Sequence, residues 1–469
     1  MTSPSITSPA MSGPALAAAP AAPVPDSPLS AAPVSGADRI GSLDVLRGIA
    51  VFGILLMNIS AFGLVWQAYG NPLAAGGSTG VNLLLFEIMN VGFEGTMRGI
   101  FSMLFGAGIV LMTVRMERAG VGIAAADIYF RRMAWLGLFG LIHWTLLLWP
   151  GEILFAYAIC GFALFVVRKV PARWQLAIGI ALLAVAAVKM ELGYRGTLED
   201  AGHAAQAQAV LAQGGTLDEE QRETLDAWNE TLSEYVPTAE TDAMFMEWHS
   251  GSYVSSVLQQ LPFSFEFQWV RAPFWLAFDM VPFMLIGMAL LKWDVLTAQR
   301  GTGFYAGMAA AGYAVGIPLG LYELGLLQAG DYGPVASAAA GRTYQFSRLA
   351  MVLGHLGLVL CVVRLGLFPM LQRGFAAAGQ MALTNYMTQT LICITLFYGF
   401  GFGLYGRFDR SQLYLIVATI AAVQMIWSLA WLHHFRFGPL EWLWRTLTYW
   451  KWQPMARAVP VHAAAPGHA

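Results

Sequence analysis

Charged residues are scarce in this sequence. Only 12% of its 469 residues are Asp, Glu, Lys or Arg, whereas a soluble domain usually carries about 25%. At the same time 57% of the residues are hydrophobic, and the mean hydropathy is +0.58. This balance excludes an ordinary soluble enzyme and predicts a protein whose main solvent is lipid. The formal net charge of −2 gives no basis for nucleic-acid binding.

Cysteine is also rare, and its pattern excludes two kinds of site. Cys160, Cys361 and Cys393 each lie inside an apolar run, without CxxC or Cys/His spacing. We therefore expect small buried hydrophobic residues, with neither a disulfide framework nor a metal site. Residues 1–38 lack the basic-then-apolar pattern of a cleavable signal peptide. They are mostly Ala, Pro and Ser, which predicts a disordered cytoplasmic tail.

Long apolar runs dominate the rest of the chain and predict an all-α fold. A helix needs about 20 apolar residues to cross a bilayer core about 30 Å thick. Runs of that kind lie near 44–66, 95–114, 132–149, 152–168, 173–192, 273–292, 303–327, 345–364, 379–399 and 411–432. We predict a polytopic transmembrane helical bundle of about ten spans. Residues 82–94 are expected to form an amphipathic surface helix, broken from the second span near Gly92 or Gly95.

One hydrophilic insert, residues 193–270, divides the predicted bundle. It separates an N-terminal transmembrane half (39–192) from a C-terminal half (271–450), which is followed by a flexible tail (451–469). The insert is rich in Asp and Glu at its start, and we expect a small acidic helical hairpin outside the membrane. Its charge is explained either by a solvated cap or by a lid that gates substrate.

Lysine and arginine gather in alternate loops, which predicts the orientation of the chain. By the positive-inside rule these loops face the cytoplasm of a bacterial inner membrane. Both termini are then cytoplasmic. Arg407 and Arg410 are the main exceptions, since they fall in a predicted outer loop. The loops on the predicted inner side contain Arg115, Arg118, Arg131, Arg132, Arg168, Lys169, Arg173, Lys292, Arg300, Arg364, Arg373, Arg436, Arg445 and Lys451.

Ionisable groups within the spans need a partner or a water-filled cavity. Asp44 and Arg47 are three residues apart and share a helix face, and Asn58 lies on the same stripe near the outer end. Glu94 precedes Arg98 by four residues, the favourable order for an ion pair. Each set is explained either by structural pairing between helices or by the wall of a polar passage.

The C-terminal half adds further polar groups at membrane depth. Arg348 and His355 are seven residues apart on one face, and Asp279 has no obvious local partner. The ninth span carries a polar stripe made of Gln380, Thr384, Asn385, Thr388 and Gln389. Together these groups predict a water-accessible cavity that opens outward.

His143 is the strongest candidate for chemistry. It lies eleven residues beyond Arg132, which is about 16 Å along a helix. Glu152 follows shortly after a Pro-Gly turn, and a histidine beside a carboxylate can act as a general base. A structural interpretation also exists, because a lone histidine can be a packing residue and Glu152 would suit the positive end of a helix dipole.

Several stretches resemble a known family. RIGSLDVLRGIAVFGILLMNI (39–59), FEGTMRGIFSMLFGAG (93–108) and GLIHWTLLLWPGEILFAYAICG (140–161) resemble the YeiB-like family of bacterial inner-membrane proteins, a domain of unknown function (DUF418). So do AAGQMALTNYMTQTLICITLFYGFGFGLYG (377–406) and HFRFGPLEWLWRTLTY (434–449). Glu152 replaces the usual Asp of this pattern and keeps the carboxylate, whereas Gln380 replaces a usual basic residue.

The LDxxRG opening is also similar to that of the wider transmembrane acyltransferase superfamily. Those enzymes transfer an acyl group from a cytoplasmic donor to an acceptor across or outside the membrane. The preferred hypothesis is therefore a membrane-bound acyltransferase, because the basic inner loops align with a histidine at mid-membrane depth and carboxylates further out. Acyl-CoA would be the donor, attracted by Arg39, Arg115, Arg131 and Arg132. His143, oriented by Glu152 or Glu94, would be the general base acting on an extracytoplasmic or lipid-linked acceptor. The substrate-binding candidates are Asp44, Arg47, Asn58, Arg98, Arg348, His355, Asn385 and Gln389.

Two other hypotheses remain open at this point. Intramembrane Arg/Glu pairs and glycine-rich helices equally suit a permease for a small anionic or amphiphilic solute, although the two halves show no convincing inverted repeat. The third hypothesis is a non-catalytic scaffold, embedded in the lipid bilayer, that serves envelope assembly.

Overall fold

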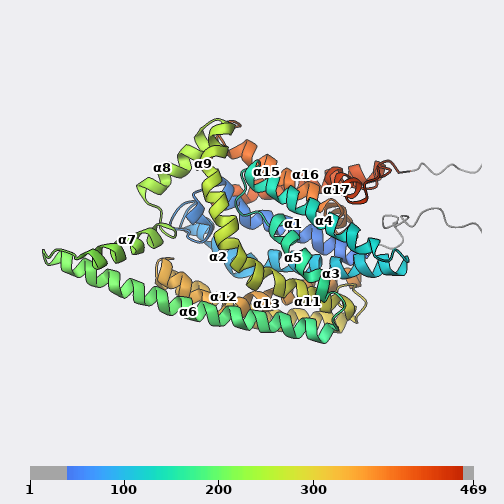
Figure 1. Ribbon diagram of the computed structural model, residues 1–469, viewed down its shortest axis with the longest axis horizontal. Coiled ribbons are helices and arrows are strands. Elements are labelled where there is room, and N and C mark those ends of the chain that lie inside the picture. The colour runs from blue at the N-terminus through green and yellow to red at the C-terminus, as the bar shows by residue number, and fades with distance from the viewer. Residues whose placement is uncertain (1–39, 458–469) are drawn as a thin grey trace, which may run out of the picture.

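The protein is an elongated bundle of helices. The computed structural model describes residues 40–457, and in this range the regular elements are helical, with no β-strand (Figure 1). The predicted all-α class is therefore confirmed. The N-terminal helices are α1 (Gly41–Gly63), α2 (Gly80–Phe93), α3 (Thr96–Arg118), α4 (Ala124–Thr145) and α5 (Leu154–Val167), with a 3₁₀ turn, η2 (Trp66–Tyr69), after α1.

The break between α2 and α3 falls at Gly95. This residue has φ of +65°, in the left-handed region that glycine adopts without the steric cost of a Cβ atom. The break falls at one of the two predicted positions. Residues 80–118 nevertheless form one apolar helical stretch of 39 residues that is long enough to cross a membrane, so the predicted separate surface helix is not confirmed.

The insert does not begin as a separate unit. Helix α6 (Ala172–Ala212) runs through the predicted boundary at residue 193 and projects beyond the bundle (Figure 1). Helix α7 (Glu219–Ser233) returns beside α6, so the two helices form the expected hairpin. The first helix of this hairpin, α6, also contains the predicted fifth span (173–192). Helices α8 (Ala239–Ser250) and α9 (Tyr253–Glu266) then lead back to the end of the bundle.

The helix at the predicted sixth span (273–292) is broken near its start. Two π-helical segments, η3 (Phe267–Arg271) and η4 (Leu276–Met280), flank the short α10 (Ala272–Trp275) before α11 (Val281–Lys292). The chain bends by 52° across this region. Asp279 lies in the second π-helical segment, and such segments frequently mark functional positions.

The C-terminal half contributes the remaining helices. They are α12 (Thr302–Ala329), α13 (Pro334–Leu365), α14 (Pro369–Gln380), α15 (Ala382–Phe397), α16 (Arg410–His434) and α17 (Pro439–Tyr449). Helix α14 packs closely on α1, because Gly48 and Gly379 leave no room for a Cβ atom between the two backbones. Small residues at a helix interface allow this kind of approach in membrane proteins.

Six helical stretches in the described residues are long and apolar enough to cross a membrane, or seven if the bent pair around Asp279 is one span. The prediction of about ten spans is therefore not confirmed. The ten predicted runs are largely helical, but α5 has only 14 residues and α15 only 16, short of the roughly 20 that a span needs.

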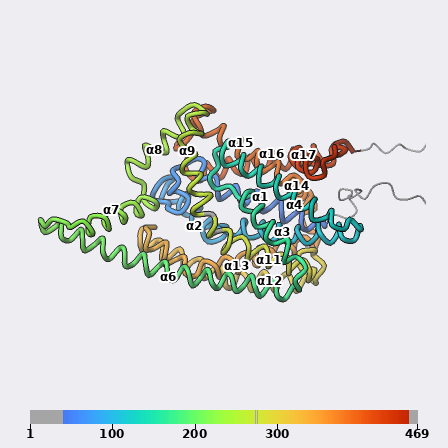
Figure 2. The backbone as a smooth tube through the Cα atoms, viewed as in Figure 1, coloured from blue at the N-terminus to red at the C-terminus, as the bar shows by residue number. Residues whose placement is uncertain are grey.

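The bundle has two different ends. The described part of the chain begins and ends at the same end of the bundle (Figure 1). Basic residues meet there: Glu117 pairs with Lys169 at 3.0 Å, and Lys292 donates to the carbonyl of Arg168 at 2.8 Å. We call it the basic end, marked by Arg115, Arg132, Arg168, Lys292 and Arg445. Helices α8 and α9 cover the opposite end (Figure 2).

Candidate functional site

A cavity of about 380 Å³ lies at the basic end, between α1, α3, α4, α5, α15, α17 and the end of α14. Its volume is within the range of about 300–1,000 Å³ typical of small-molecule sites. Its polar lining consists of Asp44, Arg47, Arg115, Tyr129, Arg132, Tyr157, Gln380, Tyr386, Glu441, Arg445 and Tyr449. The sequence predicted a cavity that opens outward. The cavity in the structure lies at the basic end, and at the opposite end Phe245 and Trp248 of the insert pack against Leu148 and Trp149.

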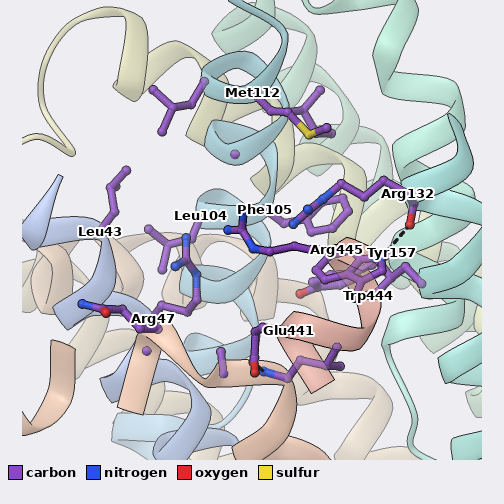
Figure 3. Close-up of a pocket in the computed structure, with 18 of the residues that line it drawn as sticks. Leu43, Arg47, Leu104, Phe105, Met112, Arg132, Tyr157, Glu441, Trp444 and Arg445 are labelled. Atoms are coloured by element: carbon purple, nitrogen blue, oxygen red, sulfur yellow. Dashed lines mark hydrogen bonds between the residues drawn. The ribbon is translucent and has the colours of Figure 1, made fainter. Parts of the chain in front are cut away.

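Aromatic rings position two of the cavity's arginines. The guanidinium carbon of Arg132 lies 3.7 Å from the ring centroid of Trp444, and Trp444 Nε1 donates to the Arg132 carbonyl at 2.9 Å, the dashed line in Figure 3. Arg445 lies over Phe437 at 4.5 Å. A cation–π contact holds a guanidinium group without using its N–H donors. Those donors are the groups that bind carboxylates and phosphates.

The carboxylates of the cavity have structural partners. Asp44 pairs with Arg47 at 2.9 Å on α1. Glu441 accepts the backbone N–H groups of Leu383 at 2.7 Å and Thr384 at 3.0 Å, and the Thr384 hydroxyl at 2.6 Å. Burial raises the pKa of Glu441, although the hydrogen bonds act in the opposite direction. With four arginines and two carboxylates, the described lining has a formal excess of two positive charges. It therefore favours an anion.

The interior of the cavity is apolar. Helix α3 presents one face along its length, with lining residues three or four positions apart as on a helix stripe. Tyr157 and Tyr386 line the inner end, where the ring of Tyr157 packs on Phe101 of α3 and its hydroxyl lies 2.7 Å from Ser102 Oγ. The apolar lining includes Phe101, Leu104, Phe105, Met112, Leu136 and Leu154. A charged mouth and an apolar interior together match an amphiphile with an anionic head group.

His143 lies behind this cavity. It is fully buried, with Nε2 2.8 Å from Thr390 Oγ1 and Nδ1 3.7 Å from Glu152 Oε1. Its ring is 4.9 Å, edge to face, from that of Tyr386. Because Tyr386 lines the cavity and His143 does not, a single side chain separates the histidine from the space where a ligand would lie.

Glu152 also has the structural role that its position predicts. Its carboxylate accepts the backbone N–H groups of Leu154 and, at 2.8 Å, of Phe155 at the first turn of α5. This is the positive end of the helix dipole. Glu152 therefore both begins α5 and faces His143.

A second charged cluster lies away from the cavity. Asp279 pairs with Arg98 at 2.8 Å and also with Arg348, while Arg348 donates to Gln345 Oε1 at 2.7 Å. Asp279, which has no partner in its own sequence neighbourhood, is thus the centre of the cluster. A buried carboxylate between two guanidinium groups is satisfied electrostatically.

The other polar candidates connect helices. Glu94 accepts a hydrogen bond from Tyr344 at 3.1 Å, and His355 Nδ1 is 3.1 Å from the Tyr313 hydroxyl. Asn385 donates to the Ala378 carbonyl at 3.0 Å and Ser428 Oγ at 3.1 Å, and Gln389 donates to Gln424 at 3.0 Å. These residues do not line the cavity, and neither do Asn58, Arg98 and Arg348.

Of the four arginines predicted to attract the donor, two line the cavity in the structure. Arg115 and Arg132 line the cavity. Arg131 instead pairs with the exposed Asp127 at 2.7 Å. Arg39 lies outside the described residues. The sequence analysis missed Glu441, Trp444 and Arg445 as site residues, although the amphipathic pattern of 439–449 was available to suggest a helix with one buried face.

Comparison with known proteins places the chain in a family. A family profile described as a protein of unknown function, DUF418, matches residues 290–451. The chain is 30% identical to YeiB of Escherichia coli (strain K12) over 429 residues, which cover 88% of this chain and 96% of YeiB. It belongs to the DUF418 family. The resemblance to YeiB-like proteins is therefore confirmed.

Other DUF418-like relatives are similar over nearly their whole length. YxaH of Bacillus subtilis (strain 168) is 29% identical over 439 residues, covering 90% of this chain and 98% of YxaH. A 39.9 kDa protein in the amylase 3′ region of Bacillus acidopullulyticus is 28% identical, covering 88% of this chain and 94% of the relative. All three relatives are described as uncharacterised. No solved structure matches the chain.

Proposed function

We propose that this DUF418 membrane protein binds acyl-CoA in the cavity at its basic end and transfers the acyl group to an extracytoplasmic or lipid-linked acceptor. The observation that supports this function best is the cavity itself, with arginines at the mouth and an apolar interior that ends at Tyr386, whose ring packs against His143. The proposal places the protein in the bacterial inner membrane with both termini cytoplasmic. The concentration of Lys and Arg at the basic end supports that orientation.

The geometry of α4 fits a long donor. Arg132 and His143 are eleven residues apart, so they lie on nearly the same face and about 16 Å apart along the helix axis. A donor whose phosphate binds Arg132 and the neighbouring Arg445 would extend its acyl arm inward toward Tyr386 and His143. Guanidinium groups bind phosphate through paired, charge-assisted hydrogen bonds.

The chemistry follows from the environment of His143. An acceptor hydroxyl or amine adds to the thioester carbonyl carbon while His143 takes its proton, and the C–S bond then breaks. The proton passes from His143 to the departing CoA thiolate. Glu152 beside Nδ1 stabilises the imidazolium that forms, as a carboxylate orients the histidine in other acyl-transfer sites. Tyr386 has to turn aside for the thioester to reach His143.

Binding of labelled acyl-CoA to the purified full-length protein tests the first half of the proposal. Arg132→Ala should weaken binding by about tenfold or more, since a hydrogen bond to a charged group contributes about 1.5–3 kcal/mol. The matched control is Arg131→Ala, which removes the same charge from the adjacent position and should change affinity less than about twofold. Equal losses in the two variants would contradict a donor site at Arg132.

His143→Ala tests the second half. It should keep acyl-CoA binding and lose transfer of the labelled acyl group to membrane acceptors, because only proton transfer is removed. Transfer at the wild-type rate would exclude His143 as the general base and leave the binding site unaffected.

The second candidate is a permease for an anionic amphiphile. The broken helix around Asp279 favours it, because discontinuous helices form the substrate sites of many transporters. Uptake into proteoliposomes that requires Arg98 and Arg348, and proceeds without CoA, would decide for transport.

A further inference from the structure

Helix α15 carries four threonines, and the hydroxyl of one of them, Thr390, contacts His143. A threonine inside a helix can bond back to a carbonyl of the preceding turn. Thr388 and Thr395 do so, at 2.8 and 2.7 Å. The Thr390 hydroxyl instead points across to α4, where its Oγ1 is 2.8 Å from His143 Nε2. Both side chains of this pair are buried.

Glu152 determines which nitrogen of His143 carries the proton. Its Oε1 lies 3.7 Å from Nδ1, and the negative charge of the carboxylate favours an N–H group on that side. The opposite tautomer would direct the Nδ1 lone pair at the carboxylate. Nε2 is then the unprotonated nitrogen, and it accepts the hydrogen of the Thr390 hydroxyl. The nitrogen that acts as base in the proposed reaction therefore faces Thr390.

Thr390 also lies next on the route inward from the cavity. It follows Tyr386 by four residues, so the two side chains share a face of α15 and are about 6 Å apart along the helix axis. Tyr386 lines the inner end of the cavity, and Thr390 does not. Once Tyr386 has turned aside, as the proposed function requires, Thr390 is the next polar side chain on this face.

We infer that Thr390 relays a proton between His143 and the acceptor. This inference rests on the proposed function and adds a residue to its chemistry. As the acceptor oxygen or nitrogen adds to the thioester carbonyl carbon, its proton passes to Thr390 Oγ1, and the hydroxyl proton of Thr390 passes to His143 Nε2. The C–S bond then breaks, and the same two transfers in reverse deliver a proton to the CoA thiolate. Thr390 and His143 thus return to their starting states, and no further reactant is needed.

Replacing the Thr390 hydroxyl tests the relay. Single-turnover transfer of a labelled acyl group from bound acyl-CoA to membrane acceptors is measured for the full-length wild type, Thr390→Val and Thr390→Ser. Thr390→Val keeps the shape of the side chain and should lower the rate about 100-fold or more, as loss of a positioned proton transfer does. Thr390→Ser keeps the hydroxyl and should stay within about fourfold of the wild type, the effect of one buried methyl group. Acyl-CoA affinity should change less than about twofold in both, because only the chemical step is altered.

Thr395→Val is the matched control. It removes a hydroxyl from the same helix, but one that bonds to that helix, and it should transfer at the wild-type rate. A solvent isotope series separates a relay from a residue that only orients His143. With two protons moving in one step, the wild-type rate should follow a curve against the deuterium fraction of the solvent. Thr390→Val should give a straight line, because one proton moves in its residual reaction.

The outcomes separate this inference from the proposed function. If the wild type transfers no acyl group, the proposed function is wrong and the relay with it. If the wild type transfers the group but Thr390→Val keeps its rate, or if the wild-type isotope dependence is linear, only the relay is wrong. If Thr390→Val does not fold, as judged by thermal unfolding, the isotope dependence of the wild type carries the test.

Discussion

The two ends of the bundle differ in charge and in how tightly they are packed. At the basic end four arginines surround a cavity of about 380 Å³. At the opposite end Trp66, Trp149, Trp248, His249 and Tyr405 enclose a pocket of only about 20 Å³, room for about one water molecule. The larger cavity is lined by charged side chains at its mouth, whereas aromatic rings fill most of the opposite end. The proposed donor therefore has room at the basic end and none in the pocket at the opposite end.

The insert contributes directly to the closed end. Gln268, in the first π-helical segment, donates to the carbonyl of Pro150 at 2.7 Å and of Glu152 at 3.1 Å. Tyr253 donates to the Leu146 carbonyl at 2.7 Å. These bonds hold the loop that follows His143. A lid that admitted an acceptor to His143 would have to release the same contacts, so they connect the insert to the proposed chemistry.

The largest expected difference between the two ends is in the free energy of unfolding that is lost when a tryptophan is removed. Trp149 is buried and stacks on Phe62 with ring centroids 4.0 Å apart. Trp149→Ala should lower the free energy of unfolding by about 3–5 kcal/mol, because it leaves a large cavity in packed structure. The matched control is Trp452→Ala at the basic end, where the side chain is exposed, with an expected loss below about 1 kcal/mol.

Denaturation in mixed detergent micelles measures both losses, and acyl-CoA binding is followed in parallel. Trp149→Ala should bind acyl-CoA with wild-type affinity, since the residue does not line the basic-end cavity. Similar unfolding free energies for the two variants would mean that the opposite end is not held closed by packing.

A smaller expected effect is a pH dependence of the free energy of unfolding that arises from His249 at the closed end. Burial lowers the pKa of His249 to about 4, and its ring stacks on Tyr405 at 3.7 Å. The unfolded chain binds the proton more tightly, with a pKa of about 6.5. The stability due to neutral His249 is therefore complete above about pH 6.5 and is lost as pH falls toward about 4, by up to about 3 kcal/mol.

His249→Asn isolates this contribution, because an amide can still donate to the Phe245 carbonyl that His249 Nδ1 approaches at 2.7 Å. Unfolding free energies measured from pH 7.5 to 4 should fall more steeply for the wild type than for the variant. Parallel curves would show that protonation of His249 does not open the closed end.

Much of the fold follows from the sequence because hydrophobic runs report contact with lipid. The predicted apolar runs locate the helices, but the end of an apolar run is not the end of the helix. Helix α6 therefore continues to Ala212 although its apolar part ends near residue 192. Arg410 shows a similar limit for predicting the orientation of the chain from its charged residues. It is buried and donates to the Ala75 carbonyl at 3.2 Å, so it caps backbone and does not report the side of the membrane.

The candidate site was predicted only in part, because much of it depends on tertiary contacts. Arg115 and Arg132 are recognisable from their place beside apolar runs. Arg445 and Trp444 join them only through the packing of α17 on α4. The partner of Asp279 could not be found locally, since Arg98 lies 181 positions away in the sequence.

The most direct measurement for the central claim is photo-crosslinking with an acyl-CoA that carries a diazirine on its pantetheine arm, which would lie between the mouth and His143. The full-length protein is irradiated in detergent and the adducts are mapped by mass spectrometry. We expect adducts on the α3 face from Phe101 to Met112, which unlabelled acyl-CoA removes and which Arg132→Ala reduces more than Arg131→Ala. Adducts confined to the lipid-facing surfaces of α12 and α16, or adducts that unlabelled acyl-CoA does not remove, would contradict a donor site at the basic end.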